Sequence, residues 1–294
     1  MSGAPGPGSD PAAGSSPVTG PAAGPTDWAS GESGIVGGIR LGVRTRVEDA
    51  LLDARRWATL EPRRLARAAR REPPRRLRVL AIGVEREDRE NLMDTARAEL
   101  RRSRHDVEVA TCGVGGRGKF ENLNALLDAH PLDGRDWLLV LDDDVALPHG
   151  FLDAFLFLAD RFGLKLAQPA HRRRSHAAWR VTRRRGGSVV RETGFVEIGP
   201  LCAFHRDTFA TLLPYPRLQA GWGLDSHWAA LARERGWPIG VVDATPIRHV
   251  LRPFADSYRR ADAMAEAQAF LAGRPYVTAS EAQRTLATHG RWRA

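Results

Sequence analysis

Residues 137–148 read WLLVLDDDVALP and join an uninterrupted apolar run, 137–141, to three consecutive aspartates. A short apolar run without alternation is typical of a strand that is buried on both faces of a sheet. Carboxylates cannot be buried there unpaired, so the strand must end at Asp142. The aspartates should therefore lie at the carboxyl edge of a sheet, which is where open α/β sheets bind their ligands.

The first and third aspartates form a candidate metal site. Side chains at positions i and i+2 of an extended segment point the same way, so Asp142 and Asp144 could both face one hard divalent cation that also holds phosphate oxygens. The alternative is a solvated acidic turn that opens the helix expected after Pro148, since acids favour helix N-termini.

The composition indicates an ordinary globular chain. Its 294 residues, 43% of them hydrophobic, allow one large or two modest domains with a sizeable core. The formal charge of +9 comes almost entirely from Arg and is weak evidence for a nucleic-acid partner. Two cysteines, Cys112 and Cys202, make neither a disulfide framework nor a zinc cluster. Without a long apolar run or a signal-peptide pattern, we expect a cytoplasmic protein.

Four segments differ in composition. Residues 1–40 are rich in Gly, Pro, Ala and Ser, which predicts a disordered tail. Residues 41–76 are Arg-rich and helix-forming, and we interpret them as a basic helical lead-in that packs on the domain or is solvated. Peripheral attachment to the inner face of a membrane is the alternative. Residues 77–252 form the expected folded domain, and 253–294 the expected C-terminal helices.

The hydrophobic pattern of the folded domain alternates between strands and helices. Strands are predicted at 77–84, 107–112, 137–141 and 164–168, with helices at 88–102, 120–129 and 148–161 between them. This order predicts a three-layer α/β/α domain with a mostly parallel central sheet, as in Rossmann-like folds. Further strands are predicted at 195–205 and 238–242, and further helices at 207–213, 224–235, 254–272 and 279–289.

The segment GWGLD, residues 221–225, is a second candidate site. Glycines on both sides of Trp222 permit an unusual backbone path and close approach of a ligand, and the indole offers a flat face to a sugar ring. Asp225 opens the next predicted helix. It could be a structural N-cap or a general base that deprotonates a hydroxyl nucleophile.

Two weaker features lie near these motifs. His249, in the segment IRH just beyond the strand 238–242, could complete an Asp/Asp/His metal site or be a hydrogen-bonded structural residue. The glycine-rich loop 113–119 joins a strand to a helix and suits phosphate contact, although its spacing matches neither a Walker loop nor a dinucleotide fingerprint.

Together these motifs resemble those of GT-A-fold glycosyltransferases. The order of DxD (142–144), GWG with a following acid (221–225) and IRH (247–249) is most similar to β-1,4-galactosyltransferases. A poorly characterised plant and bacterial GT-A-like group is similar through QPA (168–170), FVEIGP (195–200) and GVVD (240–243). The resemblance covers about 77–252. One Leu precedes Asp225 where the galactosyltransferases have an adjacent Glu-Asp pair, so their specificity is not carried over.

The resemblance implies a GT-A fold and a metal-dependent transfer, with Mn²⁺ or Mg²⁺, from a nucleotide-diphosphate sugar to a hydroxyl of a glycan, lipid-linked or small-molecule acceptor, with inversion. It assigns the nucleotide or metal side to Asp142, the metal to Asp144 and His249, and the base to Asp225. The remaining assignments place Lys119, Asn122 and Asp143 on the nucleotide side, and Trp222, Gly223 and Glu197 on the acceptor side.

Three interpretations of other acidic and basic residues stay open. In a phosphatase of the haloacid dehalogenase type, Asp142 would be the nucleophile and Asp144 the acid/base, but the motif follows two strand–helix units and no later acidic pair is evident. The Arg runs 172–174 and 183–185 could contact diphosphate or an anionic acceptor, or form a solvated face. Glu197 could be a second acid at the acceptor site or the partner of an arginine.

A non-enzymatic protein that binds nucleic acid or a membrane through its basic residues is the last alternative. It explains the Arg runs but gives no purpose to the DxD, GWGLD and IRH segments. Aromatic residues are few and are not interleaved with the basic runs, unlike a stacking platform for bases. We therefore expect no nucleic-acid partner.

Overall fold

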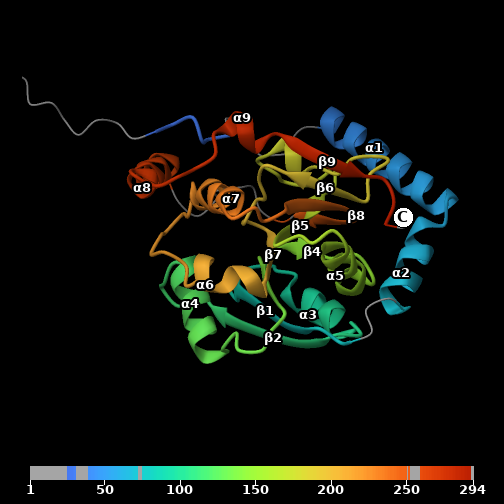
Figure 1. Cartoon of the computed structure of the whole chain (residues 1–294), viewed down its shortest axis with the longest axis horizontal. Helices are drawn as coiled ribbons and strands as arrows, with labels where there is room; N and C mark the ends of the chain where they lie inside the picture. Colours follow the sequence, from blue (N-terminus) through green and yellow to red (C-terminus); the bar gives the residue numbers. More distant parts are fainter. Residues whose placement is uncertain (1–24, 31–38, 72–74, 250, 252–258, 293–294) are drawn as a thin grey trace, which may run out of the picture.

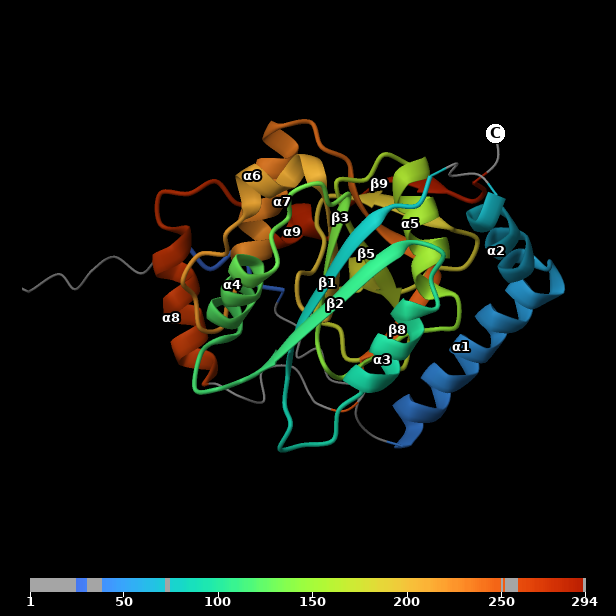
Figure 2. The same ribbon diagram turned by 90° about the horizontal axis from the view of Figure 1, so that it is seen from below.

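The computed structural model describes residues 25–30, 39–71, 75–249, 251 and 259–292. A central β-sheet is covered by helices on both faces (Figures 1 and 2). The predicted α/β class and layered arrangement are confirmed. In the described residues, no helix has the length and apolar character needed to cross a membrane.

The sheet has the strand order β2-β1-β3-β7-β5-β8-β6-β9. β7 and β6 run antiparallel to their neighbours, so the other strands of this path all share one direction. The short strand β4 pairs with the end of β8. The strands span β1 Arg78–Glu85, β2 Asp106–Gly113, β3 Trp137–Leu141, β4 Val145–Ala146, β5 Leu166–His171, β6 Val190–Thr193, β7 Leu201–His205, β8 Ile239–His249 and β9 Thr285–His289.

Two hydrophobic clusters fill the space between the sheet and its helices. Successive side chains of a strand point to opposite faces, and in β1 Leu80 and Ile82 join one cluster while Val79 and Ala81 join the other. The first cluster lies under α4, α7 and α8, and the second under α2, α3 and α5. The main helices span α1 Ile39–Ala58, α2 Glu61–Arg71, α3 Met93–Arg101, α4 Lys119–Ala129, α5 Phe151–Arg161, α6 Phe209–Leu212, α7 Leu224–Glu234, α8 Arg260–Leu271 and α9 Ala279–Ala282.

The strand predicted at 238–242 is longer in the structure. β8 continues through Asp243 to His249, because the carboxylate of Asp243 is paired with Arg191 of β6 inside the protein. The Arg191 Nε and Asp243 Oδ2 atoms are 2.7 Å apart, and both side chains have no exposed surface. A carboxylate can be buried within a strand when it is paired and hydrogen-bonded, and Asp243 has the guanidinium of Arg191 as its partner.

Three other segments differ from the sequence-based predictions. The predicted strand 195–205 is a strand only from Leu201, since 194–200 form no ladder. The predicted helix 279–289 is a single turn, α9, followed by β9, whose threonines favour an extended backbone. The predicted disordered tail is wrong for residues 25–30, where Trp28 is buried in the first cluster. The rest of 1–38 and the start of the predicted helix 254–272 lie outside the described residues.

The arginine runs bind the N-terminal helix to the domain. Arg184 is 2% exposed, and its guanidinium lies 3.2 Å from Asp49 Oδ1 and 2.9 Å from Asp53 Oδ1, both on α1. Arg172 also pairs with Asp53, and the backbone N–H groups of Arg173 and Arg174 donate to Asp49. For Arg172 and Arg184, the expectation of a solvated basic face or a diphosphate contact is therefore wrong, since their guanidinium groups form ion pairs with aspartates of α1.

Breaking the Arg191–Asp243 pair should lower the stability more than breaking any other ion pair in the described structure. Asp243→Asn leaves a fully buried guanidinium without its counter-charge, and we expect the free energy of unfolding to fall by about 3–5 kcal/mol, measured by urea denaturation. Arg44→Gln, which breaks an exposed i,i+4 pair with Glu48, is the control and should change it by less than about 0.5 kcal/mol. Equal effects of the two substitutions would contradict this assignment.

Candidate metal centre

The candidate metal centre forms where β4 pairs with β8. Val145 lies opposite His249 in this antiparallel ladder, and Ala146 lies opposite Arg248. Asp144 directly precedes β4, so the pairing brings its carboxylate beside the imidazole. Asp142 directly follows β3, whose end is held by the hydrogen bond from its N–H to the carbonyl oxygen of Pro200 at 2.9 Å. Residues more than a hundred positions apart thus meet at one edge of the sheet.

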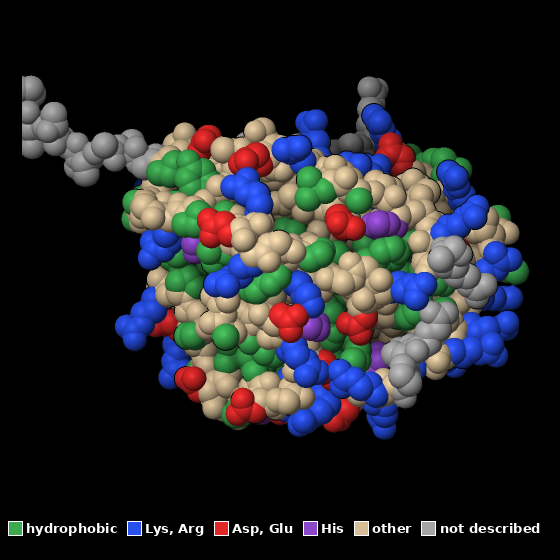
Figure 3. Space-filling model, viewed as in Figure 1, with side chains coloured by type: hydrophobic (Ala, Val, Ile, Leu, Met, Phe, Trp, Pro, Cys, Tyr) green, Lys and Arg blue, Asp and Glu red, His purple; other side chains and the backbone are tan. Residues whose placement is uncertain are grey.

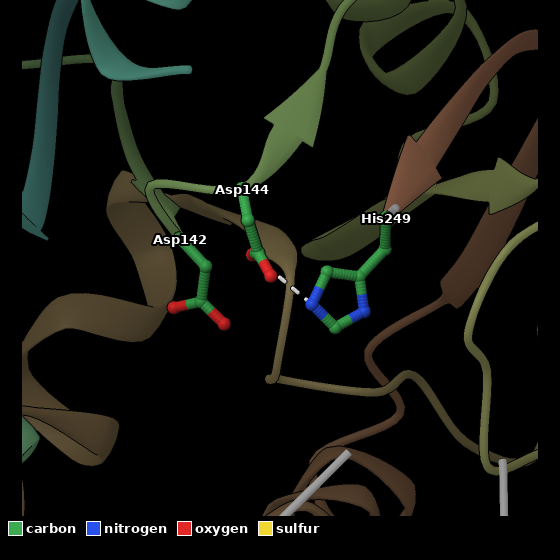
Figure 4. Close-up of side chains that lie close together, drawn as sticks. All are labelled: Asp142, Asp144 and His249. Atoms are coloured by element: carbon green, nitrogen blue, oxygen red, sulfur yellow. Dashed lines mark ion pairs between the residues drawn. The ribbon is translucent and has the colours of Figure 1, made fainter. Parts of the chain in front are cut away.

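The three side chains point toward one another (Figure 4). His249 Nε2 and Asp144 Oδ1 are 3.0 Å apart, and one ligand atom from each of Asp142, Asp144 and His249 lies within 4.8 Å of the others. Asp144 and His249 are buried, whereas Asp142 is half-buried. Two carboxylates and an imidazole are a donor set suited to Mn²⁺ or Mg²⁺, so these residues could hold a divalent cation, as expected from the sequence.

The imidazole of His249 is oriented by residues that sequence reasoning missed. Its backbone N–H donates to Ser175 Oγ at 2.8 Å, and its carbonyl oxygen accepts from the N–H of His176 at 3.0 Å. Its Nδ1 lies 3.4 Å from the carbonyl oxygen of His176. A carbonyl oxygen only accepts, so Nδ1 must carry the proton. Nε2 is then the nitrogen that faces Asp144 and is available to a metal.

The charges of the cluster shift the pKa values of its members. Burial raises the pKa of Asp142, and the nearby charge of Lys119 opposes this while that of Asp144 adds to it. Burial alone would lower the pKa of His249, but its hydrogen bond to Asp144 and the surrounding negative charges outweigh burial and raise it. Without a metal the imidazole is therefore stabilised as a cation, and a metal would take the place of its Nε2 proton.

Lys119 lies beside the cluster, at the start of α4. Its ammonium forms an ion pair with Asp142 and donates to the carbonyl oxygen of Gly199 at 3.2 Å. The lysine therefore links the glycine-rich loop, the aspartates and the loop before β7. A positive charge at this place is compatible with the predicted nucleotide side.

Two other residues predicted on the nucleotide side make contacts within the protein. The carboxylate of Asp143 accepts from the backbone N–H of Arg86 at 2.8 Å, which holds the loop after β1, and this residue is not part of the cluster. The side-chain amide of Asn122 donates to the carbonyl oxygen of Val114 at 2.9 Å and holds the glycine-rich loop. Both side chains are buried, so the structure uses them as supports for two loops at the sheet edge.

Glu197 is buried beside a histidine and not beside an arginine. Its Oε2 lies 3.4 Å from His171 Nε2 and accepts from Thr182 Oγ1 at 3.3 Å, while its backbone N–H donates to the side chain of Gln168. Burial alone would raise the pKa of Glu197, but the interaction with His171 outweighs it and lowers the pKa. His171 was missed in the sequence, although it follows QPA at the carboxyl end of a buried strand.

Asp225 lies in the first turn of α7, where Gly223 is the N-cap, so the N-cap interpretation of Asp225 is wrong. Its Oδ1 accepts the N–H of Ser226 at 3.0 Å. Burial, with the negative charge of Glu197 as a second cause, raises the pKa of Asp225 to about 7. Glu197 also acts on the pKa of His249, so it is an electrostatic neighbour of both the metal cluster and the candidate base.

The glycines of GWG are required by packing within the protein. A Cβ on Gly221, whose φ is +71°, would lie 2.1 Å from the ring of Phe120, and a Cβ on Gly223, whose φ is +81°, would lie 2.9 Å from Leu271. The predicted unusual backbone path is present, and protein side chains occupy the space that was expected for a ligand. Trp222 is half-buried, with the guanidinium of Arg260 5.9 Å from the centre of its ring.

Comparison with known proteins identifies no relative from sequence. No protein-family profile matches the chain, and no curated protein matches it. Solved structures give similarities of low identity. A197 from STIV matches with a TM-score of 0.41 and 12% identity, covering 60% of this chain and 87% of that one. GalNAc-T7, solved with UDP, GalNAc and Mn²⁺, matches with a TM-score of 0.43 and 12% identity, covering 63% of this chain and 45% of that one.

A third similar structure is a protein from Desulfovibrio desulfuricans G20 that is described as a nucleotide-diphospho-sugar transferase. Its TM-score is 0.34 at 9% identity, and the match covers 56% of this chain and 79% of that one. At these scores the similarities do not assign a function to this chain.

The raised pKa of Asp225 predicts a pH-dependent stability. Between the ordinary value of 3.8 and about 7, the unfolded carboxyl is ionised while the folded one keeps its proton, so stability is lost as the pH rises through this window. Asp225→Asn removes this titration and should stabilise the protein at pH 8 relative to pH 4, on the order of 4 kcal/mol, as measured by chemical denaturation. Asp88→Asn, at an exposed aspartate, should show no such difference. A pH-independent effect of Asp225→Asn would disprove the shift.

Proposed function

We propose that this protein is a metal-dependent glycosyltransferase that moves a sugar from a nucleotide-diphosphate donor to a hydroxyl acceptor. The observation that supports this most is the convergence of Asp142, Asp144 and His249 at the carboxyl edge of the sheet, with their ligand atoms within 4.8 Å. The motif resemblance to GT-A glycosyltransferases, which assigns these positions to the nucleotide and the metal, agrees with it.

In this proposal Asp142, Asp144 and His249 hold Mn²⁺ or Mg²⁺. A divalent cation held there would supply positive charge against the negative charge that develops on the diphosphate as the glycosidic bond breaks. Lys119 adds a positive charge at the same place through its ion pair with Asp142. Asp143 and Asn122 contribute by fixing the two loops that border the nucleotide side.

The acceptor side is assigned to the GWGLD segment. We assign Asp225 as the general base that takes the proton of the acceptor hydroxyl, because a carboxylate with a pKa of about 7 is a stronger base than an ordinary aspartate and is about half ionised at neutral pH. Trp222 would line the acceptor, Gly223, the N-cap of α7, would position Asp225, and Glu197 would raise the basicity of Asp225 by its negative charge. Attack from the side opposite the leaving diphosphate would invert the anomeric centre.

The two alternatives from the sequence make different demands on these residues. A phosphatase would need Asp142 as a nucleophile, whereas its carboxylate is held by Lys119. A protein that only binds a partner through its Arg runs would need the side chains of those runs free, whereas Arg172 and Arg184 are paired with α1, and it would give no role to the Asp142, Asp144 and His249 cluster. A thermal-shift screen of UDP- and GDP-sugars with and without Mn²⁺, beside an assay with nitrophenyl phosphate, separates the three. Stabilisation by one nucleotide sugar that requires Mn²⁺ is the expected result.

Metal binding should depend on Asp144. We expect the wild-type protein to bind Mn²⁺ in calorimetry, and Asp144→Ala to weaken this binding at least about tenfold, because second-shell changes alone already cost about 10–100-fold in metal affinity. Nucleotide binding that requires Mn²⁺ should fall with it. Asp88→Ala, at an exposed acid on the loop after β1, is the control and should bind as the wild type does. Unchanged Mn²⁺ affinity in Asp144→Ala would remove this residue from the metal site.

The role of Asp225 should separate turnover from binding. Asp225→Asn keeps the size of the side chain but cannot accept the hydroxyl proton, and general-base catalysis contributes about 10²–10⁴-fold, so kcat should fall by about that factor. The donor Kd measured by calorimetry should stay near the wild-type value. Near-normal turnover in this variant would exclude Asp225 as the base while leaving the metal site intact.

A further inference from the structure

The orientation of α1 on the domain is the reverse of that of an ordinary surface helix. Its buried side is polar, with Thr45 and Asp49 only 7% and 5% exposed. Its solvent side is apolar, since Val43, Val47 and Leu51 are 55%, 52% and 66% exposed. A surface helix normally turns its apolar stripe toward the core. Here the ion pairs of Asp49 with the arginines of the domain hold the polar side inward.

The apolar stripe continues to the turn between α1 and α2. Val43, Val47 and Leu51 follow one another at i, i+4 and i+8, which places them along one side of the helix. Trp57 and Leu60 at the turn are 54% and 45% exposed. Leu60 has a φ of +52°, a left-handed conformation that strains a residue with a side chain. We call these five residues the outer apolar face.

Exposed arginines surround the outer apolar face. In Figure 3 Lys and Arg side chains gather along the edge of the molecule that carries α1 and α2 in Figure 1. The last turns of both helices are basic. The exposed arginines of the two helices are Arg44, Arg46, Arg55, Arg63, Arg64, Arg67, Arg70 and Arg71. Arg44 alone among them has a described carboxylate within 4.0 Å, that of Glu48, so the surface carries a net positive charge.

We propose that the outer apolar face of α1 and the turn to α2 dock on an anionic lipid bilayer. A helix that lies in the membrane interface combines an apolar stripe, flanking basic residues and a tryptophan, and each of these is present here. A second copy of the chain is a less favourable partner for this face, because the exposed arginines of the two copies would repel each other across the contact. This docking goes beyond the proposed transfer reaction and does not depend on it.

A pocket between α1 and the domain is lined by four arginines and two aspartates, with Arg46, Asp49, Ala50 and Asp53 on the helix and Arg172, Arg174 and Arg248 on the domain. Arg248 directly precedes His249 in β8. In the described residues Arg46, Arg174 and Arg248 have no carboxylate within 4.0 Å, so the pocket presents positive charge to headgroup phosphates at the membrane surface.

Vesicle co-sedimentation of the full chain tests the proposal. We expect the wild-type protein to bind vesicles of an equimolar mixture of phosphatidylcholine and phosphatidylglycerol, and not vesicles of phosphatidylcholine alone. Leu51→Glu should lower the partition coefficient at least about tenfold, because it replaces an apolar contact with the bilayer by a charge that the anionic surface repels. Raising the salt concentration should weaken wild-type binding by screening the arginines.

Leu286→Glu is the matched control, since Leu286 is a leucine of β9 that is 62% exposed and lies outside the docking face. It should bind vesicles as the wild type does. Absence of wild-type binding to the anionic vesicles, or an equal loss in both variants, would overturn the proposal. So would a wild-type dimer in sedimentation equilibrium that Leu51→Glu dissociates without any vesicle binding, because that result assigns the face to a second copy of the chain.

Discussion

The buried ion pair of Arg191 with Asp243 is the interaction on which the candidate site depends. It allows β8 to continue past an acidic residue in the protein interior, and the strand then reaches His249. Only because β8 is that long can its last residues pair with β4. That pairing in turn places the imidazole next to Asp144. A structural charge pair in the middle of the strand thus determines the geometry at its end.

The sequence predicted the residues of the site better than it predicted their supports. The end of β3 at Asp142 and the shared direction of Asp142 and Asp144 follow from strand geometry and the cost of burying carboxylates. The approach of His249 depends on a pairing between β4 and β8 that no local pattern specifies. The roles of Ser175, His176 and His171 also depend on tertiary contacts. The one sequence signal for them is that they follow a buried strand.

The errors in the fold have a common physical origin. β8 was predicted too short and Arg184 was predicted to be solvated or to bind anions, because the sequence does not show which distant residue will pair with a charged side chain. The structure supplies these partners from distant segments, Arg191 in one case and α1 in the other. Trp28 and β9 were missed for a similar reason, since a short segment becomes ordered when it finds a core or a sheet edge to pack against.

The contact of Gly221 with the ring of Phe120 has a mechanical consequence. Phe120 is the neighbour of Lys119 in the first turn of α4, and the glycine leaves no room between the GWG loop and that ring. A displacement of this loop would press on the ring at the start of α4, beside the lysine whose ammonium group pairs with Asp142. The GWG segment and the metal cluster are therefore joined by direct packing through Phe120.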